Sequence, residues 1–398
     1  MKIALFNLGF RPFFLAAGLY SLLAMIAWAL IYQQGPGLPT VLPAIYWHGH
    51  EMIYGYGVAV LSGFLLTSVR NWTGIDTPRG TPLALLLGLW LAARISVWSG
   101  QLGWAMGADL LFSIGLLCGL IPPLVKTGQN NQTGLMALVT ALLMSNQLFY
   151  LSALPEVSLA LFADAGPTYF SANQTLLTGL YILIAIILLM IGRLLPAFTR
   201  MATQGKVVLA PLPALEKPLG FLIVGFILLA PHWITIPFAE TAIAMISLLL
   251  ALVHGYRLYF WRHREIAARP LLWVIYLAYL FMVLGFFARA AQSLGVPTMV
   301  ATHCFAVGGV GLATLGLMAR VALGHTGRDV YDPPKLNLPM IVLLLAGTLV
   351  RVATPLLFPR FYPQGVLIAQ CLWIAAFGLF LLIYTPKLVS PRPDGKPG

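Results

Sequence analysis

The chain of 398 residues is 60% hydrophobic and 9% charged, and its mean hydropathy is +0.90. These values exclude a water-soluble globular fold and indicate a polytopic membrane protein. The formal net charge is +12. Basic loops on the inner side of a membrane and anionic lipid explain such an excess, so we expect membrane lipid as a partner and no nucleic acid.

The elements predicted along the chain are all apolar helices. A spanning helix needs about 20 mostly apolar residues, and roughly twelve such windows follow one another. They lie near residues 12–32, 49–69, 81–99, 105–125, 134–153, 172–192, 218–238, 240–261, 271–291, 298–319, 337–357 and 364–384. The seventh window contains Pro231, so this helix should bend or end early. Because the apolar runs are long and continuous, the sequence predicts an all-α transmembrane bundle and excludes a barrel.

The basic residues predict the orientation of these helices. With the N-terminus inside, nineteen of the 23 lysines and arginines fall in inner segments. The four exceptions are Arg94, Arg289, Arg351 and Arg360, at outer helix ends. This distribution predicts an even number of spans with both termini cytoplasmic. We expect a single integral membrane domain over residues 1–398, with halves 1–195 and 215–398 joined by a cytoplasmic loop.

Histidines gather at one predicted depth of the membrane. The stretch "WHGHEMIYGYG" places His48, His50 and Glu51 at the outer mouth of the second span, and "THCFAVGGVG" places His303 at the same depth in the tenth. Ionisable groups there are costly unless they are paired, hydrated or bound to metal, so such a cluster indicates function. Neutral imidazole binds haem iron, copper and zinc, which all remain open. Glu51 would either orient a ligating imidazole or carry protons.

Two further sets of residues suit a metal site. Haem carries two propionates, and the outer arginines Arg94, Arg289 and Arg351 are candidates to pair with them. A second group of histidines lies nearer the inner side. It consists of His254 in "LVHGYRL" and His325 in "GHTGR".

Several separated motifs resemble the NnrS family of bacterial membrane proteins. The first is "WHGHEMIYGYGVAVLSGFLLTSVRNWTG", which joins a histidine-rich entrance to a glycine-rich helix and an N-W-T-G turn. The others are "GRLLPAFTR", "LVHGYRL" and "THCFAVGGVGLATLGLMARVALGHTGR". They run through most of the chain in the family's order. One departure is Cys304, where a small apolar residue is expected, and a thiol beside His303 would alter copper binding.

The resemblance implies a twelve-span protein of the bacterial cytoplasmic membrane that carries haem and copper. It also implies a role in nitric oxide metabolism or in protection from nitrosative stress during denitrification-type metabolism. Carried over onto this sequence, the family motifs assign the outer metal ligands to His48, His50 and His303, with Glu51 as a supporting catalytic carboxylate. They assign the propionate partners to Arg94, Arg289 and Arg351, and further metal ligands to His254 and His325.

The reaction itself stays open at this point. Haem iron with nearby copper would bind nitric oxide and either convert it or keep it from other iron centres. The sequence has no C-x-x-C-H haem attachment, no ferredoxin-like cysteine set and no glycine-rich nucleotide loop, so electrons would come from a quinol or a protein donor. The alternative is a secondary transporter with histidine-coupled movement of protons or metal. The number of outer histidines favours the metalloprotein, because solute transport does not require them.

Overall fold

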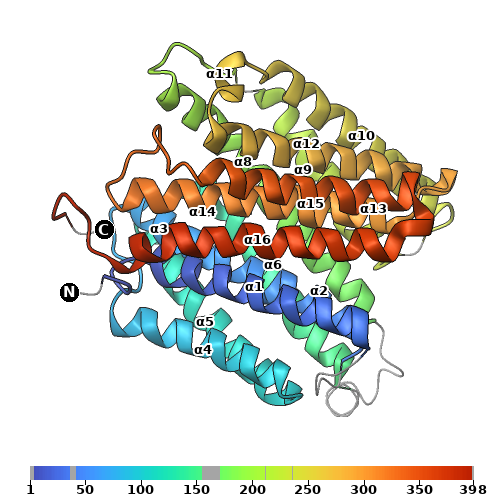
Figure 1. The fold of residues 1–398 in the computed structure, drawn as a ribbon, viewed down its shortest axis with the longest axis horizontal. Coiled ribbons are helices and arrows are strands. Elements are labelled where there is room, and N and C mark those ends of the chain that lie inside the picture. Colours follow the sequence, from blue (N-terminus) through green and yellow to red (C-terminus); the bar gives the residue numbers. More distant parts are fainter. Residues whose placement is uncertain (1–3, 36–41, 155–170, 211, 235, 397–398) are drawn as a thin grey trace. The chain divides into compact units, whose positions relative to one another are not determined.

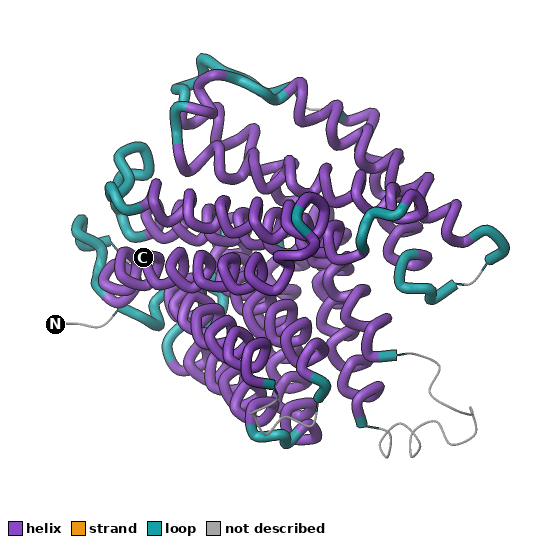
Figure 2. The backbone as a smooth tube through the Cα atoms, turned by 45° about the vertical axis from the view of Figure 1, so that its right-hand side comes forward, coloured by secondary structure: helices purple, strands orange, loops and turns teal. Residues whose placement is uncertain are grey.

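The computed structural model describes residues 4–35, 42–154, 171–210, 212–234 and 236–396. These residues form helices joined by loops, with no strand among them (Figure 2). Eleven helices in the described part of the chain are long and apolar enough to cross a membrane. The structure therefore confirms the predicted all-α polytopic bundle.

The candidate spans follow the predicted windows closely (Figure 1). Their helices are α1 (Phe10–Gln34), α2 (Ala44–His50) with π-helix η1 (Glu51–Gly57) and α3 (Val58–Thr73), α4 (Thr81–Trp98), α5 (Leu102–Lys126), α6 (Thr133–Ala153), α8 (Ala172–Ala202), α10 (Ala239–Phe260), α12 (Pro270–Ala290), α13 (Thr298–His303) with π-helix η5 (Cys304–Gly311) and α14 (Leu312–His325), α15 (Asn337–Leu357) and α16 (Tyr362–Val389).

The seventh predicted window holds a shorter helix, α9 (Pro213–Leu229), of 17 residues. It ends two residues before Pro231, as expected, because proline lacks the N–H that would continue the hydrogen-bond ladder. The chain then turns, and His232 adopts a left-handed backbone conformation with φ of 64°. The early end leaves α9 below the length of a full span.

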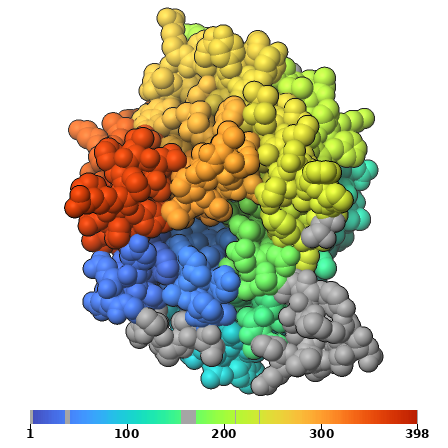
Figure 3. Space-filling view, turned by 90° about the vertical axis from the view of Figure 1, so that its right-hand side faces the viewer, coloured from blue at the N-terminus to red at the C-terminus, as the bar shows by residue number. Residues whose placement is uncertain are grey.

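The chain divides into two compact units. Unit 1 comprises residues 1–182, 321–328 and 381–398, and unit 2 comprises residues 183–320 and 329–380. Within unit 1, α3 packs against α1 and α5, and within unit 2, α12 packs against α10 and η5. The segments of unit 2 drawn in yellow, gold and orange form a continuous surface in Figure 3.

Two of the candidate spans are more buried than the rest, and each carries a histidine just before a π-helix. In each of the two spans, Ala44–Thr73 and Thr298–His325, 89% of an apolar 18-residue window is buried, more than in any other candidate span of the described residues. In unit 1, His50 is followed by η1, and in unit 2, His303 is followed by η5. A π-helix inside an α-helix is rare and is often found at functional sites.

The glycines of these two spans keep the same spacing from the histidine. One glycine lies five residues and another thirteen residues after it. They are Gly55 and Gly63 after His50, and Gly308 and Gly316 after His303. A Cβ on Gly55 would lie 2.7 Å from Tyr20 of α1, and a Cβ on Gly316 would lie 2.5 Å from Val274 of α12. In both units the missing side chain thus lets the preceding helix approach closely.

Candidate functional site

Six polar side chains meet in the interior of unit 1. They are His50 and Glu51 at the junction of α2 and η1, Arg94 of α4, Asp109 of α5, and Asn146 and Tyr150 of α6. We call this group the unit 1 cluster. Each is at most 4% exposed to solvent. Charges this deeply buried must be paired and hydrogen-bonded, and the six side chains form one connected network.

Asp109 is the acceptor at the centre of the unit 1 cluster. It forms an ion pair with Arg94. Its Oδ2 also accepts hydrogen bonds from Asn146 Nδ2 at 2.9 Å and from the Tyr150 hydroxyl at 2.8 Å. Beside a guanidinium, Asp109 is a carboxylate and can only accept. The amide nitrogen of Asn146 is therefore turned toward Asp109, and its oxygen is turned toward His50.

This orientation fixes the proton on one ring nitrogen of His50. Asn146 Oδ1 lies 2.9 Å from His50 Nε2, so Nε2 must donate. The other nitrogen, Nδ1, lies 2.6 Å from Glu51 Oε1. A single proton between these two atoms gives either an imidazolium beside a carboxylate or an imidazole beside a carboxylic acid. Both forms have the same total charge.

The shared proton makes the unit 1 cluster electrically neutral. Arg94 is positive, Asp109 is negative, and the pair of His50 and Glu51 adds no net charge. Arg94 Nη1 also donates to Glu51 Oε1 at 3.1 Å, which links the two halves of the network. Glu51 Oε2 is buried and has no hydrogen-bond partner among the described residues. The cluster can thus hold one proton on Glu51 in an otherwise apolar region.

The π-helix η1 supports the cluster with its backbone. In a π-helix the backbone hydrogen bonds join residues five apart instead of four, and this change leaves a backbone carbonyl available to a donor outside the helix. Trp90 of α4 donates from its indole Nε1 to the Gly55 carbonyl at 3.1 Å. The Tyr54 hydroxyl donates to the Thr175 carbonyl at 3.0 Å and lies 3.0 Å from the Ser145 hydroxyl. These contacts tie the segment after His50 to α4, α6 and α8.

In unit 2, the backbone decides the tautomer of His303. Its Nδ1 lies 2.7 Å from the carbonyl oxygen of Met299. A carbonyl can only accept, so Nδ1 carries the hydrogen, and a neutral His303 has its lone pair on Nε2. Metal-ligating histidines commonly donate their other ring N–H to a carbonyl or carboxylate in this way. His303 therefore has the tautomer that a metal ligand requires.

His254 is the buried histidine of α10, and it is 4% exposed. Its Nδ1 lies 2.5 Å from the Tyr279 hydroxyl of α12. Nε2 makes no hydrogen bond to any residue that the structure describes. The imidazole also stacks on Phe286 with ring centroids 6.1 Å apart, and Phe286 contacts Phe305 of η5. When Nδ1 donates to Tyr279, Nε2 carries a lone pair suited to a metal.

The two remaining candidate histidines lie against aromatic rings. His48 stacks on Trp28 of α1, with ring centroids 4.5 Å apart and planes 9° apart. His325, at the end of α14, lies 5.6 Å from the Phe10 ring in unit 1. Both rings are thus held in place by packing.

A family model described as NnrS protein matches residues 4–392, which is nearly the whole chain. The chain belongs to the NnrS family. No curated protein matches its sequence. Membership confirms the resemblance that the motifs showed, and it links this NnrS chain to nitric oxide at the level of the family.

The three arginines proposed as propionate partners differ in what they already bind. In this NnrS chain, Arg94 already forms ion pairs with Glu51 and Asp109 in the unit 1 cluster. Arg289 is 3.4 Å from Glu240 in unit 2. Arg351 donates from Nη2 to the Tyr362 hydroxyl at 2.9 Å, and its Nη1 is buried without a hydrogen-bond partner among the described residues. Arg351 is therefore best placed to bind an anion.

The predicted metal ligands also differ in how well they fit a metal. Both ring nitrogens of His50 are bound within the unit 1 cluster, so a metal there would require one of these hydrogen bonds to break. His303 and His254, both in unit 2, each have Nδ1 within hydrogen-bond distance of a protein oxygen, which is the arrangement that metal-ligating histidines commonly show. No group of three or more His, Cys, Asp or Glu side chains that could hold a metal ion occurs in the described part of the chain. Haem iron needs only one or two axial histidines, so a site without such a group can still hold haem.

Sequence reasoning missed four residues that complete these sites. Asp109, Asn146 and Tyr150 complete the unit 1 cluster, and Tyr279 holds His254. Asp109 and Asn146 did give a signal, because a carboxylate and an amide inside apolar helices are costly and need partners. Tyr150 and Tyr279 gave none, since tyrosine is common in membrane helices.

Proposed function

We propose that this protein binds nitric oxide inside the bacterial cytoplasmic membrane at a haem or copper centre held by His303, and thereby protects against nitrosative stress in denitrification-type metabolism. The observation that carries the proposal is the tautomer of His303, whose Nδ1–H donates to Met299. A bound haem or copper would supply a metal that coordinates nitric oxide. Nitric oxide is small and uncharged, so it reaches a site in the bilayer without a polar channel.

Several other residues have defined roles in this proposal. The Met299 carbonyl holds the imidazole in the ligating tautomer. Arg351 offers its unpartnered Nη1 to a haem propionate, with Tyr362 keeping the guanidinium in position. His254, held by Tyr279, serves as a second and separate metal position.

The unit 1 cluster would serve the chemistry as a proton store. Reduction of nitric oxide consumes protons and electrons, and protons are scarce in the apolar part of a membrane. The pair of His50 and Glu51 shares one proton, and Glu51 Oε2 is the atom without a partner in the described residues. Glu51 thus gives up a proton while Arg94 stabilises its carboxylate. The electrons would come from a quinol or a protein donor.

The first test is an optical spectrum of the detergent-purified protein, oxidised and dithionite-reduced, with metal analysis of the same sample. The expected result is a Soret band that shifts on reduction and again with nitric oxide. His303→Ala should lose the band, whereas the matched variant His50→Asn should keep it, because His50 has no free ring nitrogen. A colourless protein after expression with ample haem, together with no bound copper, would contradict the proposal.

Proton-coupled secondary transport is the second candidate function, and the shared proton of His50 and Glu51 is the observation that favours it. Such a transporter would move protons across proteoliposomes when a solute or metal gradient is applied, without nitric oxide. Glu51→Gln would abolish that flux. Proton movement that depends on nitric oxide and a reductant would favour the metalloprotein instead.

A further inference from the structure

Two adjoining cavities of unit 2 surround α11 (Arg264–Ala267), the short helix between α10 and α12. The larger cavity has a volume of about 790 Å³, and the smaller one about 530 Å³. They share His263 and Arg264 as a common wall. His263 accepts a hydrogen bond from the backbone N–H of Glu265 at 3.2 Å, which fixes the start of α11.

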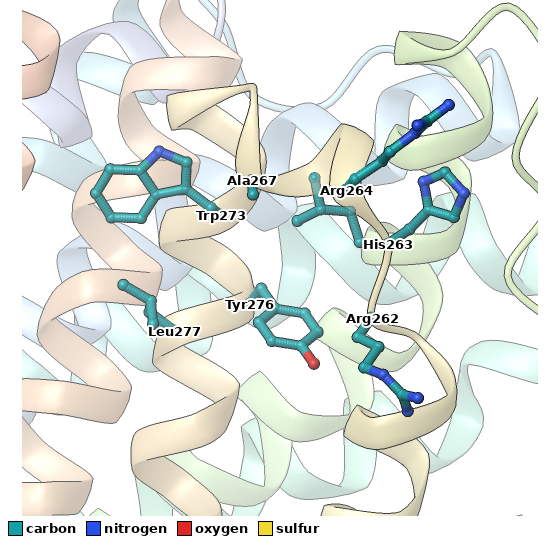
Figure 4. A pocket seen from close by; sticks show the side chains of 8 residues that line it. Arg262, His263, Arg264, Ala267, Trp273, Tyr276 and Leu277 are labelled. Carbon is teal, nitrogen blue, oxygen red and sulfur yellow. The ribbon is translucent and has the colours of Figure 1, made fainter.

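The larger cavity is apolar on one side and basic on the other. Trp273, Tyr276 and Leu277, from the first turns of α12, line one side of it. Arg262 and Arg264 lie opposite, as Figure 4 shows. We call this cavity the apolar niche. Its aromatic and aliphatic wall suits a hydrocarbon chain, and its basic border suits a group of negative charge.

The smaller cavity is polar and basic, and we call it the basic niche. Lys206, Arg264 and Arg269 line it, and Glu265 is the only acidic residue among its described lining residues. The Nε atom of Arg269 is buried and has no hydrogen-bond partner among the described residues. A buried guanidinium N–H without an acceptor is costly, so an anion in the basic niche would satisfy it.

We propose that the two niches together bind one anionic phospholipid, with an acyl chain in the apolar niche and the phosphate at Arg264 and Arg269. The kind of ligand follows from the arrangement of the apolar and basic residues that line the two niches. Arg264 borders both niches, so it lies where the apolar and the charged parts of one molecule must join. Basic pockets at the cytoplasmic ends of membrane helices bind lipid headgroups in this manner.

A free phosphate would use the basic niche alone and leave the apolar niche without a role. Use of the apolar niche therefore distinguishes a phospholipid headgroup from a free phosphate. Arg320 strengthens the case for net positive charge at the site, because it lines a third cavity of about 290 Å³ together with Arg269. The site is independent of the histidines in the proposed function, so either proposal can fail without the other.

The test is native mass spectrometry of the full-length protein in detergent, with phosphatidylglycerol or phosphatidylcholine added. Wild type should retain phosphatidylglycerol in preference to phosphatidylcholine. Retention should fall about fivefold for each arginine removed in Arg264→Gln and Arg269→Gln. Ala267→Trp fills the apolar niche without changing charge and should also lose lipid. The control Lys126→Gln removes an exposed basic residue of unit 1 and should behave as wild type.

Circular dichroism and size-exclusion profiles identify variants that do not fold. If the arginine variants do not fold, the lipid retention of Ala267→Trp tests the proposal. Unchanged retention of phosphatidylglycerol in a folded Ala267→Trp protein would overturn the proposal. Equal retention of both lipids by wild type would overturn it as well. Displacement of the lipid by inorganic phosphate in wild type, with Ala267→Trp unchanged, would assign the site to a free anion.

Discussion

The Nδ1 atom of His50 lies 2.6 Å from Oε1 of Glu51, the next residue in the chain. Neighbouring side chains of a regular α-helix point in different directions and do not face each other. Here the α-helix α2 ends at His50 and the π-helix η1 begins at Glu51, so the two side chains meet at a change of helical geometry. The same change follows His303, but its next residue is Cys304, which cannot supply a carboxylate. Only unit 1 therefore places a shared proton at this position.

The ion pair of Asp109 and Arg94 should be essential for the stability of unit 1. Asp109→Asn removes the negative charge that pairs with the buried guanidinium of Arg94. We expect the free energy of unfolding to fall by about 3–5 kcal/mol. Denaturant titration in mixed micelles measures this loss. Asp76→Asn is the matched control, because Asp76 pairs with Arg70 at the surface and such pairs contribute about 0–1 kcal/mol. Equal losses in both variants would mean that the buried pair has no special role.

Glu51→Gln keeps the shape of the side chain and removes the carboxyl that shares the proton. If Glu51 supplies protons, the rate of nitric oxide consumption should fall by about 10²–10⁴, the usual contribution of a positioned acid or base. The nitric oxide-bound spectrum should persist, since Glu51 is not a metal ligand in this proposal. A nitric oxide electrode and an optical titration measure the two quantities. Asp332→Asn removes an exposed carboxylate and serves as the control. An unchanged rate in Glu51→Gln would exclude this proton role.

Tyr279→Phe removes the hydroxyl that lies 2.5 Å from His254 Nδ1. Loss of such a hydrogen bond to a ligating histidine weakens metal affinity by about 10–100-fold, and we expect a loss of this size for the metal at His254. Metal analysis after dialysis against a graded series of chelator concentrations measures it. The control is Tyr256→Phe on the same helix, because Tyr256 is 51% exposed. If both variants keep all their metal, His254 does not ligate it.

Gly308→Ala should destabilise unit 2, because the added methyl group would collide with Phe281 of α12. Overpacking of this kind costs about 1–3 kcal/mol. Gly88→Ala in α4 is the matched control, since no atom lies within 4 Å of its added Cβ. That variant should be neutral or more stable by about 0.5–1 kcal/mol, because alanine favours a helix more than glycine does. Thermal unfolding of both variants, followed by circular dichroism, tests the pair. Equal stability would show that η5 can move away from α12.

The histidines themselves were predictable from the sequence, but their chemistry was not. A polar residue in an apolar run indicates that a partner exists, without indicating which one. Asn146 lies 96 residues from His50 and decides its protonation. His303 differs, because its acceptor is the carbonyl of Met299 one helical turn earlier, so local geometry alone gave it the ligating tautomer.

The sequence by itself determined the fold class, because the cost of burying backbone polar groups in lipid leaves long apolar runs little choice but the helix. It also determined where α9 ends, since Pro231 acts locally through its missing N–H. Only the tertiary structure decided that His50 is enclosed by Glu51 and Asn146, and that His303 precedes a π-helix. Those features depend on which helix faces which, and side-chain packing over long chain distances sets that arrangement.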